Sequence, residues 1–336
     1  MSNFTGVDPF LLCGGYALRS NSIALQPKGV KQELTYRKKF SAHDARLLLQ
    51  ANELFEKHST VAIALVENEE VLFEKYRFPA GKNIPLFSWS MCKSLIGYLI
   101  GYVIDDINLP GSHYSKDLEG TVFGEATVRD MLIMASGVDL ALNSGNHREN
   151  QWQVLSHLHA SNLDILRFLG DRRFQSGKLF NYSSTDTQAL ANIIDNNGGF
   201  LEKFSKYIWH PSNAQSLGHW YLDKDGKVMA QAGFSATLQD WIRLAIFFSK
   251  ETHDNPYIKE ANSKQIRNIL KTVGGYYPWY GYQTWIRDDS SFWWNGSGGQ
   301  RVAVDYTTNR ILIVFSTEDM FIGDAYLLFK KFQEKS

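Results

Sequence analysis

The sequence predicts a mixed α/β fold in which a mostly helical lobe is inserted into an antiparallel sheet flanked by helices. Strand-like runs occur near both ends of the chain, at residues 61–73 and 282–316, and the region between them has helical spacing. That order does not fit alternating βαβ units. We expect residues 1–87 and 237–336 to form the sheet lobe, residues 88–236 to form the inserted helical lobe, and the two to act as one catalytic unit.

The first part of the chain is expected to supply a helix and a strand pair. Residues 41–57 place alanine and leucine side chains at helical spacing. Residues 61–66 and 71–73 are apolar runs on either side of a polar turn, which is the pattern of two paired strands.

Helix-start signals place the elements of the middle region. Residues 93–105 are mostly apolar, which indicates a helix buried on nearly all sides. Thr127 and Thr237 are each followed three residues later by an aspartate, the pattern of a capping box, so we expect helices to begin there. Thr185 is expected to cap a helix over residues 189–195.

The last quarter of the chain changes to the pattern of strands. Apolar runs are separated by turns rich in glycine and aspartate, and a final helical stretch follows. We expect strands at residues 282–287, 292–295, 301–305 and 310–316, and a helix at residues 325–331.

Composition narrows the classes of function. The chain has 35 basic and 35 acidic residues and an isoelectric point of about 7.1, so it lacks an overall field that would hold nucleic acid or an anionic membrane. Cys13 and Cys92 are the only cysteines in the sequence, too few for a disulfide scaffold or a four-cysteine zinc site. His157 and His159 would point to different faces of a helix, so we do not expect them to bind a metal.

The N-terminal sequence does not have the features of a targeting segment. It lacks the basic and apolar regions of a signal peptide, and the longest apolar stretch, residues 95–104, is too short to cross a bilayer. We expect a cytoplasmic protein, or a periplasmic one if a leader has been removed.

Ser90 and Lys93 form the first candidate pair. They stand three residues apart at the start of the expected buried helix, a spacing that places both side chains on one helix face. Free N–H groups and the positive end of the helix dipole favour an oxyanion beside the serine and a neutral lysine, which could accept the serine proton. The same spacing also arises by chance about once in a chain of this length.

Two further segments carry candidate chemistry. Tyr182 and Ser184 precede an expected helix, and a tyrosine near cations can relay a proton, although an ordinary buried tyrosine before a helix cap is the commoner case. Residues 294–296 lead into a glycine-rich turn whose backbone N–H groups could complete an oxyanion hole. A plain hairpin turn would have the same pattern.

In their order and spacing, these three segments resemble the motifs of the serine β-lactamase and penicillin-binding-protein superfamily. The motifs correspond to Ser90-x-x-Lys93, Tyr182-x-Ser184 and Trp294-x-Gly296. Within its class C branch, the chain looks most like the 6-aminohexanoate-dimer hydrolases and the β-lactamase-like esterases, over residues 61–332. Shorter segments agree with this resemblance: residues 88–94, 127–137, 233–237, 280–285 and 299–300. The sequence has no G-x-S-x-G, H-E-x-x-H, Walker A or G-x-G-x-x-G motif.

The resemblance implies a role for each motif residue. Ser90 would be the acylated nucleophile, Lys93 its base or proton relay, and Tyr182 the general acid/base for the leaving group and the deacylating water. The backbone N–H groups of Ser90 and Ser297 would form the oxyanion hole, and Ser184 would orient Lys93 or contact substrate. The other implied substrate contacts are Trp294, Asn295, Gly296 and Gln300.

Two positions depart from the superfamily pattern. Ser184 stands where asparagine is common, and Trp294 stands where a lysine or histidine usually binds the substrate carboxylate. This disfavours β-lactams and carboxylate-terminated D-peptides, and it favours a neutral or differently placed substrate. Nearby aromatic side chains would either line a cleft for that substrate or pack in the core: Tyr276, Tyr277, Trp279, Tyr280, Trp293 and Trp294.

We therefore expect a serine hydrolase that cleaves a small ester or amide substrate through an acyl-enzyme on Ser90, with no metal or cofactor and no nucleic-acid or membrane partner. The alternatives are a β-lactamase or D,D-peptidase, an acyltransferase, and a binding or sensor protein of the same fold that does not turn over. The sequence leaves open whether the protein forms a homodimer. It also leaves open whether Lys93 or Tyr182 is the acylation base.

Overall fold

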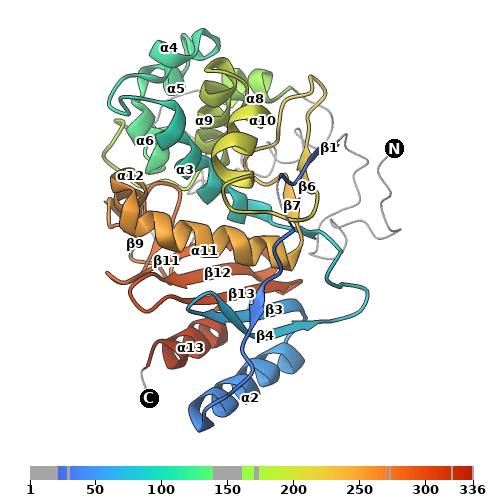
Figure 1. The fold of residues 1–336 in the computed structure, drawn as a ribbon. Helices are drawn as coiled ribbons and strands as arrows, with labels where there is room; N and C mark the ends of the chain where they lie inside the picture. Colours follow the sequence, from blue (N-terminus) through green and yellow to red (C-terminus); the bar gives the residue numbers. More distant parts are fainter. Residues whose placement is uncertain are drawn as a thin grey trace.

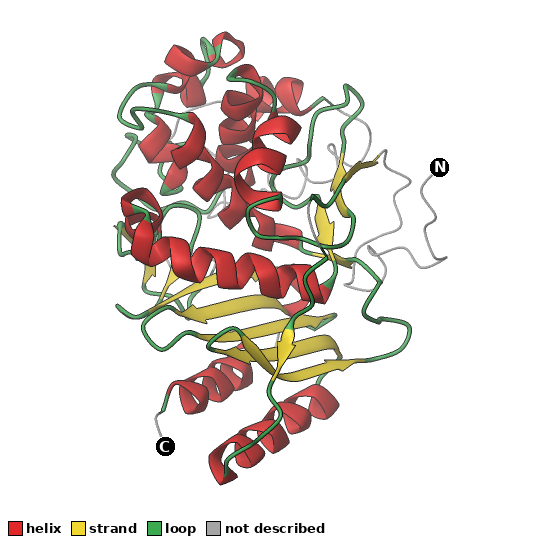
Figure 2. Ribbon diagram, viewed as in Figure 1, coloured by secondary structure: helices red, strands yellow, loops and turns green. Residues whose placement is uncertain are grey.

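The computed structural model describes residues 22–28, 31–138, 161–169, 174–269, 271, 274–318 and 321–334. Within these ranges the chain forms two sheets with helices around them (Figure 1, Figure 2). The mixed α/β class with antiparallel sheets and flanking helices is therefore confirmed. Cys13, His157 and His159 lie outside the described residues.

A nine-stranded sheet has the strand order β2-β4-β3-β13-β12-β11-β10-β9-β8. The third strand, β3 (Thr60–Glu67), pairs antiparallel with the fourth, β13 (Arg310–Ser316), so segments from both ends of the chain lie side by side in the sheet. Among the described strands of this sheet, β2 alone pairs in parallel, with β4. The other strands are β2 (Thr35–Tyr36), β4 (Glu70–Tyr76), β8 (Ile266–Arg267), β9 (Trp279–Tyr280), β10 (Trp285–Ile286), β11 (Ser291–Gly296) and β12 (Gln300–Asp305).

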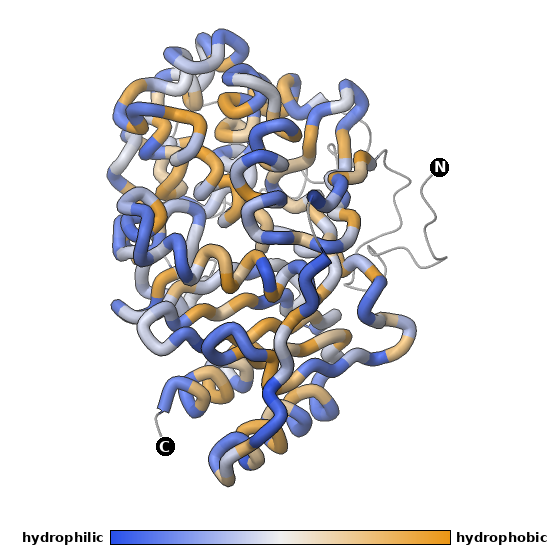
Figure 3. Tube along the Cα trace, viewed as in Figure 1, coloured by the Kyte–Doolittle hydropathy of each residue, from blue (hydrophilic) through white to orange (hydrophobic). Residues whose placement is uncertain are grey.

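Helices cover both faces of this sheet, as Figure 1 shows. α11 (Leu238–Asp254) packs on one face, while α2 (Ala42–Lys57) and α13 (Ile322–Gln333) pack together on the other. Strands that are buried on both faces are apolar throughout instead of alternating. This explains the continuous apolar run at residues 61–66 and the hydrophobic colour of the central strands in Figure 3.

The strand expected at residues 282–287 is shorter in the structure, because β10 spans only Trp285–Ile286. Gln283 has a φ of 59°, which lies in the left-handed region and is incompatible with a strand. Its buried amide instead donates to the carbonyl oxygens of Met131 and Leu132 at 3.0 and 3.2 Å. A contact with the helical region replaces strand pairing at this point.

The region between β5 and α11 is mainly helical but contains strands of a second sheet. That four-stranded sheet has the order β1-β6-β7-β5, and the sequence did not predict it, because strands this short carry little periodicity. Its members are β1 (Ser22–Leu25), β6 (Gly218–Tyr221), β7 (Phe234–Ala236) and β5 (Leu86–Phe87). The remaining α-helices are α3 (Lys93–Val103), α4 (Gly111–Tyr114), α5 (Val122–Glu125), α6 (Val128–Leu132), α8 (Asn162–Leu169), α9 (Ser184–Asn196), α10 (Phe200–Phe204) and α12 (Pro256–Ala261). The lobe boundaries at residues 87/88 and 236/237 stay a prediction.

The helix starts confirm two of the expected caps and correct a third. Thr127 and Thr237 each accept the N–H of the aspartate three residues later. α9, however, begins at Ser184, and Ser183 is its N-cap because the Ser183 hydroxyl accepts a backbone N–H of the first turn at 3.3 Å. Thr185 therefore lies inside the helix. Among the described helices, none has both the length and the apolar character needed to cross a membrane.

Candidate active site

Ser90 lies in a 3₁₀ turn that connects the small sheet to a buried helix. This turn, η1 (Trp89–Cys92), follows β5 and continues directly into α3. The N–H of Ser88 donates to the carbonyl oxygen of Phe234 at 2.9 Å, which ties the entrance of the turn to β7. The expected α-helix thus begins at Lys93, and Ser90 precedes it by one turn.

Lys93 is only 1% exposed, and its Nζ atom contacts three oxygens. Nζ lies 3.2 Å from Oγ of Ser90, 3.0 Å from Oγ of Ser184 and 2.6 Å from the carbonyl oxygen of Gln231. These three contacts fix the position of the amine beside the Ser90 hydroxyl. The structure therefore brings the first motif and Ser184 of the second motif together, although 91 residues separate Lys93 from Ser184.

Tyr182 lies just before the cap of α9 and is half-buried beside the same lysine. Its ring stacks on Trp285 with the ring centroids 5.2 Å apart. Nζ of Lys93 lies 5.5 Å from the centroid of the Tyr182 ring, within the range of a cation–π contact. Tyr182 and Ser90 both line one cavity.

Gly296 ends β11 where this strand passes against the Ser90 turn. A Cβ atom at this position would lie 2.2 Å from the carbonyl oxygen of Ser88, so no other residue fits without moving the backbone. The chain then enters the 3₁₀ turn η4 (Ser297–Gly299). The close approach of β11 to η1 places Ser297 at the same cavity as Ser90.

Hydrogen bonds of the Gln300 side chain hold the η4 turn in place. Its buried side-chain amide donates to the carbonyl oxygens of Ser297 at 2.7 Å and Ser316 at 2.9 Å, and it accepts the N–H of Ser316 at 3.0 Å. Gln300 therefore fixes the turn to β13 and does not line the cavity.

Trp294 also lies away from the cavity. It is fully buried, and its indole N–H donates to the Tyr98 hydroxyl at 2.9 Å. Side chains alternate along a strand, so Asn295 faces the cavity while Trp294 packs against α3 and α11. This corrects the expectation for Trp294 and Gln300, which we reassign from substrate contacts to support of the site.

The cavity has a volume of about 350 Å³, and aromatic side chains form part of its wall. Tyr276 and Tyr277 of the expected aromatic cluster line it, whereas Tyr280 and Trp293 are buried in the core. Among the residues that the structure describes, the lining comprises Ser90, Tyr182, Gly274, Gly275, Tyr276, Tyr277, Trp285, Asn295, Gly296, Ser297, Arg301 and Ile322.

Polar contacts hold the inner wall of the cavity. The Tyr277 hydroxyl donates to Oδ1 of Asn295 at 3.3 Å. Burial raises the pKa of Tyr277 to about 12, so this phenol is protonated at neutral pH. Nη1 of Arg301 donates to the carbonyl oxygens of Gly296 at 2.6 Å and Gln300 at 2.7 Å, which braces the backbone on both sides of η4.

No family model matches the chain. Among curated proteins, the chain is 26% identical over 216 residues to the 6-aminohexanoate-dimer hydrolase of Paenarthrobacter ureafaciens, and the match covers 60% of this chain and 54% of that protein. It therefore spans about half the length of the curated relative.

Solved structures share the fold. A Bacillus anthracis protein provisionally described as a 6-aminohexanoate-dimer hydrolase superimposes with a TM-score of 0.72 at 21% identity, over 84% of this chain and 80% of that chain. A penicillin-binding protein from Bacillus halodurans superimposes with a TM-score of 0.67 at 15% identity, over 84% and 99% of the two chains. The chain therefore has the fold of these β-lactamase-like structures, and its sequence is similar to that of a 6-aminohexanoate-dimer hydrolase. Hydrolase is the activity that the names of the two 6-aminohexanoate-dimer relatives state.

Five of the described lining residues were not predicted as site residues from the sequence: Gly274, Gly275, Trp285, Arg301 and Ile322. Trp285 stands in the 280–285 segment that carries the resemblance, so its position gave a signal, but its stacking on Tyr182 depends on the fold. Arg301 directly follows the glycine-rich turn, where a buried arginine was not expected. Ile322 comes from α13, and we find no sequence signal for its place at the cavity.

Proposed function

We propose that the protein is a serine hydrolase that cleaves an ester or amide bond through an acyl-enzyme on Ser90. One observation carries the proposal: a buried lysine contacts the hydroxyls of Ser90 and Ser184, beside a tyrosine at the same cavity. A nucleophilic serine needs a neighbouring base that is itself held in place, and Lys93 satisfies that geometry. Hydrolase activity among the named relatives supports the same reaction class.

In the acylation step, Oγ of Ser90 forms a bond with the carbonyl carbon and the bond to the leaving group then breaks. The serine proton passes to Lys93 or Tyr182, and the leaving group takes a proton relayed through Tyr182. The backbone N–H groups of Ser90 and Ser297 stabilise the oxyanion while it exists. Water then attacks the acyl carbon, supplies the hydroxyl of the acid product, and returns a proton to Ser90.

The lining of the cavity supports a substrate with an apolar part next to the scissile bond. Tyr276, Tyr277 and Trp285 supply aromatic walls, and aromatic and apolar walls with few polar groups are typical of small-molecule sites. The third motif begins with a core tryptophan instead of a cation, and Arg301, the cation among the described lining residues, directs Nη1 to the carbonyl oxygens of Gly296 and Gln300. We therefore propose a neutral ester or amide as the substrate class, in place of a β-lactam or a D-peptide with a free carboxylate.

The test is the intact mass of the protein after treatment with a fluorophosphonate probe. We expect one adduct on the wild type and none on Ser90→Ala. Ser297→Ala is the matched control, because it removes a hydroxyl at the same cavity and keeps the backbone N–H, so its adduct should form. Absence of an adduct on folded wild type would overturn the hydrolase proposal and favour a binding or sensor protein.

The next measurement separates the remaining reaction classes. Panels of neutral esters and amides should be hydrolysed in preference to cephalosporins and D-Ala-D-Ala peptides. Efficient cephalosporin turnover would instead favour a β-lactamase. Transfer of the acyl group to an added alcohol or amine in preference to water would favour an acyltransferase.

A further inference from the structure

Asn295 lies on β11 at the cavity beside Ser90, one residue before Gly296. Its side chain is half-buried, and its Oδ1 atom accepts a hydrogen bond from the Tyr277 hydroxyl at 3.3 Å. Its Nδ2 atom carries two N–H donors. In the described part of the chain Nδ2 donates to no acceptor, and it is not one of the polar atoms that are enclosed without a partner. The amide nitrogen of Asn295 therefore opens on the cavity.

Tyr277 decides which end of this amide faces the cavity. An asparagine amide can be turned over, which exchanges its oxygen and its nitrogen. Tyr277 is only 2% exposed, and Oδ1 of Asn295 is the acceptor of its hydroxyl among the described residues. In the turned-over amide, the buried O–H group would face N–H donors and lose that acceptor, which is unfavourable. Burial raises the pKa of Tyr277 to about 12, so the hydroxyl keeps its proton at neutral pH.

Arg301 adds positive charge to the same part of the wall. It faces Asn295 across the antiparallel pair of β11 and β12, and both residues line the cavity. A guanidinium group has N–H donors and no acceptor. Its Nη1 donates to the backbone carbonyl oxygens of Gly296 and Gln300. This part of the wall therefore favours a hydrogen-bond acceptor on the substrate over a donor or a cation.

A row of aromatic rings separates Asn295 from the proposed proton relay. Trp285 contacts Tyr182 with the ring centroids 5.2 Å apart, and it contacts Tyr277 with the centroids 5.5 Å apart. Because Tyr182 is the proposed relay for the leaving group, we place the leaving group at the Tyr182 end of this row. Asn295 contacts Tyr277 at the other end. The acyl part of the substrate is therefore the part that reaches Asn295.

We propose that Asn295 selects substrates whose acyl part carries a neutral hydrogen-bond acceptor, such as an ether or carbonyl oxygen, and that Tyr277 is the positioning residue that turns the amide donor toward it. This inference rests on the proposed acyl-enzyme function and narrows its substrate class. A purely hydrocarbon acyl chain would displace water from the Asn295 N–H groups without replacing its hydrogen bond, and a site built in this way rejects such an analogue.

The test is steady-state hydrolysis of p-nitrophenyl esters in matched pairs. Methoxyacetate, 3-methoxypropanoate and 4-methoxybutanoate are compared with butanoate, pentanoate and hexanoate, so an ether oxygen replaces one methylene group at three successive positions. In at least one pair, the ratio of kcat/KM for the ether ester over the hydrocarbon ester should fall by about fivefold or more from the wild type to Asn295→Leu, chiefly through KM. Asn295→Asp replaces N–H donors with acceptors and should lower the ratio further. The intrinsic reactivity of each ester cancels when variants are compared.

Tyr277→Phe tests the positioning role and keeps the proposal falsifiable if an Asn295 variant fails to fold. It should lower the same ratio by about threefold or more, because the amide can then turn over. A merely structural role of Tyr277 would change both esters of a pair alike. Ser297→Ala is the matched control, because it removes another hydroxyl at the same cavity and should keep the wild-type ratio.

Ratios that stay the same in Asn295→Leu and Tyr277→Phe would overturn this inference, as would an equal fall in Ser297→Ala. Fluorophosphonate labelling of the wild type without hydrolysis of any of these esters would overturn this inference alone. Absence of both labelling and hydrolysis in the folded wild type would overturn the proposed function, and this inference with it.

Discussion

At Gly296 the end of β11 passes so close to Ser88 that the backbones of the two segments are in contact. One of these segments carries Ser90 and the other carries Ser297. The distance between their backbone N–H groups therefore depends on the absence of a side chain at a single position. Oxyanion stabilisation requires donors within about 3 Å of the developing charge, so a small displacement here has a large effect.

Gly296→Ala should slow acylation of Ser90 by about 100-fold or more, which is the usual effect of losing one oxyanion donor. A methyl group at 2.2 Å from the Ser88 oxygen must push the two segments apart. The measurement is the rate of fluorophosphonate labelling, taken well below the unfolding midpoint of the variant. Gly81→Ala is the control, because a Cβ atom there meets nothing within 4 Å. Labelling of Gly296→Ala at the wild-type rate would contradict the proposed role of this approach.

At the scale of single residues, the sequence predicted best where the chemistry is local. The spacing of Ser90 and Lys93 places both groups within one turn, and the structure brings them to 3.2 Å. Trp294 and Gln300 were wrongly expected to contact the substrate. The direction of a side chain on a strand depends on which face of the sheet packs against the core, and the sequence pattern does not show this. Arg301 and Trp285 were missed because their contacts link segments that only the fold brings together.

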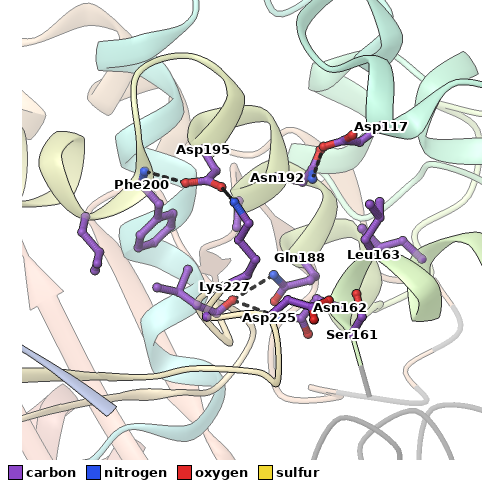
Figure 4. A pocket seen from close by; sticks show the side chains of 15 residues that line it. Asp117, Ser161, Asn162, Leu163, Gln188, Asn192, Asp195, Phe200, Asp225 and Lys227 are labelled. Carbon is purple, nitrogen blue, oxygen red and sulfur yellow. Dashed lines mark hydrogen bonds and ion pairs between the residues drawn. The ribbon is translucent and has the colours of Figure 1, made fainter. Parts of the chain in front are cut away.

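Among the elements, α9 reaches from Lys93 to a cavity of the helical region that Leu166 and Phe200 also line (Figure 4). Its first residue, Ser184, contacts Lys93, and Gln188 one turn later lines that cavity. Gln188 also donates to the carbonyl oxygen of Val228 at 2.9 Å and accepts the N–H of Ala230 at 3.0 Å. The next residue, Gln231, provides the carbonyl oxygen that Lys93 contacts. The same helix and strand connection therefore position Lys93 and also line that cavity.

Glu67, at the end of β3, joins three parts of the large sheet. Its carboxylate contacts Nη1 of Arg37 and Nε of Arg310, each at 2.6 Å. Burial opposes its ionisation, but hydrogen bonds from the two arginines outweigh burial and hold the pKa of Glu67 below its ordinary value of 4.5. A carboxyl group with a lowered pKa in the folded state stabilises the fold above its unfolded pKa and loses that contribution as the pH falls through the folded pKa.

Glu67→Gln should therefore lower the free energy of unfolding at pH 7 by about 2 kcal/mol, because two hydrogen bonds to a charged group are weakened. The difference between variant and wild type should shrink as the pH falls below about 4.5. Urea titrations at a series of pH values measure both effects. Glu69→Gln is the control, since Glu69 pairs with Lys250 at an exposed site where ion pairs contribute little. A difference that is constant with pH would show that the carboxylate charge plays no part.

The elements that the sequence predicted correctly are the long ones with strong periodicity, such as the helix at residues 42–57 and the strands at 60–67 and 310–316. The small sheet was missed because its strands have two to four residues. The strand expected at residues 282–287 is longer than the observed one. A tertiary contact, and not the neighbouring residues in sequence, determines the backbone conformation of Gln283.

In the molecule as a whole, one cluster of buried apolar side chains crosses from the sheet into the helical region. It includes Ala62 of β3, Leu95 of α3, Ala189 of α9, Trp241 of α11 and Val302 of β12. The prediction of an inserted lobe divides the chain at residues 87/88 and 236/237, but this cluster includes residues from both sides of those boundaries. Neither part can lose its packing without exposing apolar surface on the other.

Scanning calorimetry should therefore show one unfolding transition in which the calorimetric and van't Hoff enthalpies agree. Tryptophan fluorescence and far-ultraviolet circular dichroism should give coincident midpoints, because tryptophans and helices lie in both regions and the shared core makes the two regions unfold together. Two separated transitions would show that the lobes unfold independently and would contradict the expectation of a single unit.

The pairing of β3 with β13 has a consequence for the synthesis of the protein. Arg310 follows Glu67 by 243 residues, so a nascent chain carries β3 with one unsatisfied edge for most of its translation. An open strand edge can pair with other chains. The turn that carries Ser297 also emerges late, so no N-terminal fragment holds a complete acylation site. Truncated translation products should therefore be both inactive and prone to aggregate. Only chains whose synthesis continues through β13 can form the complete sheet.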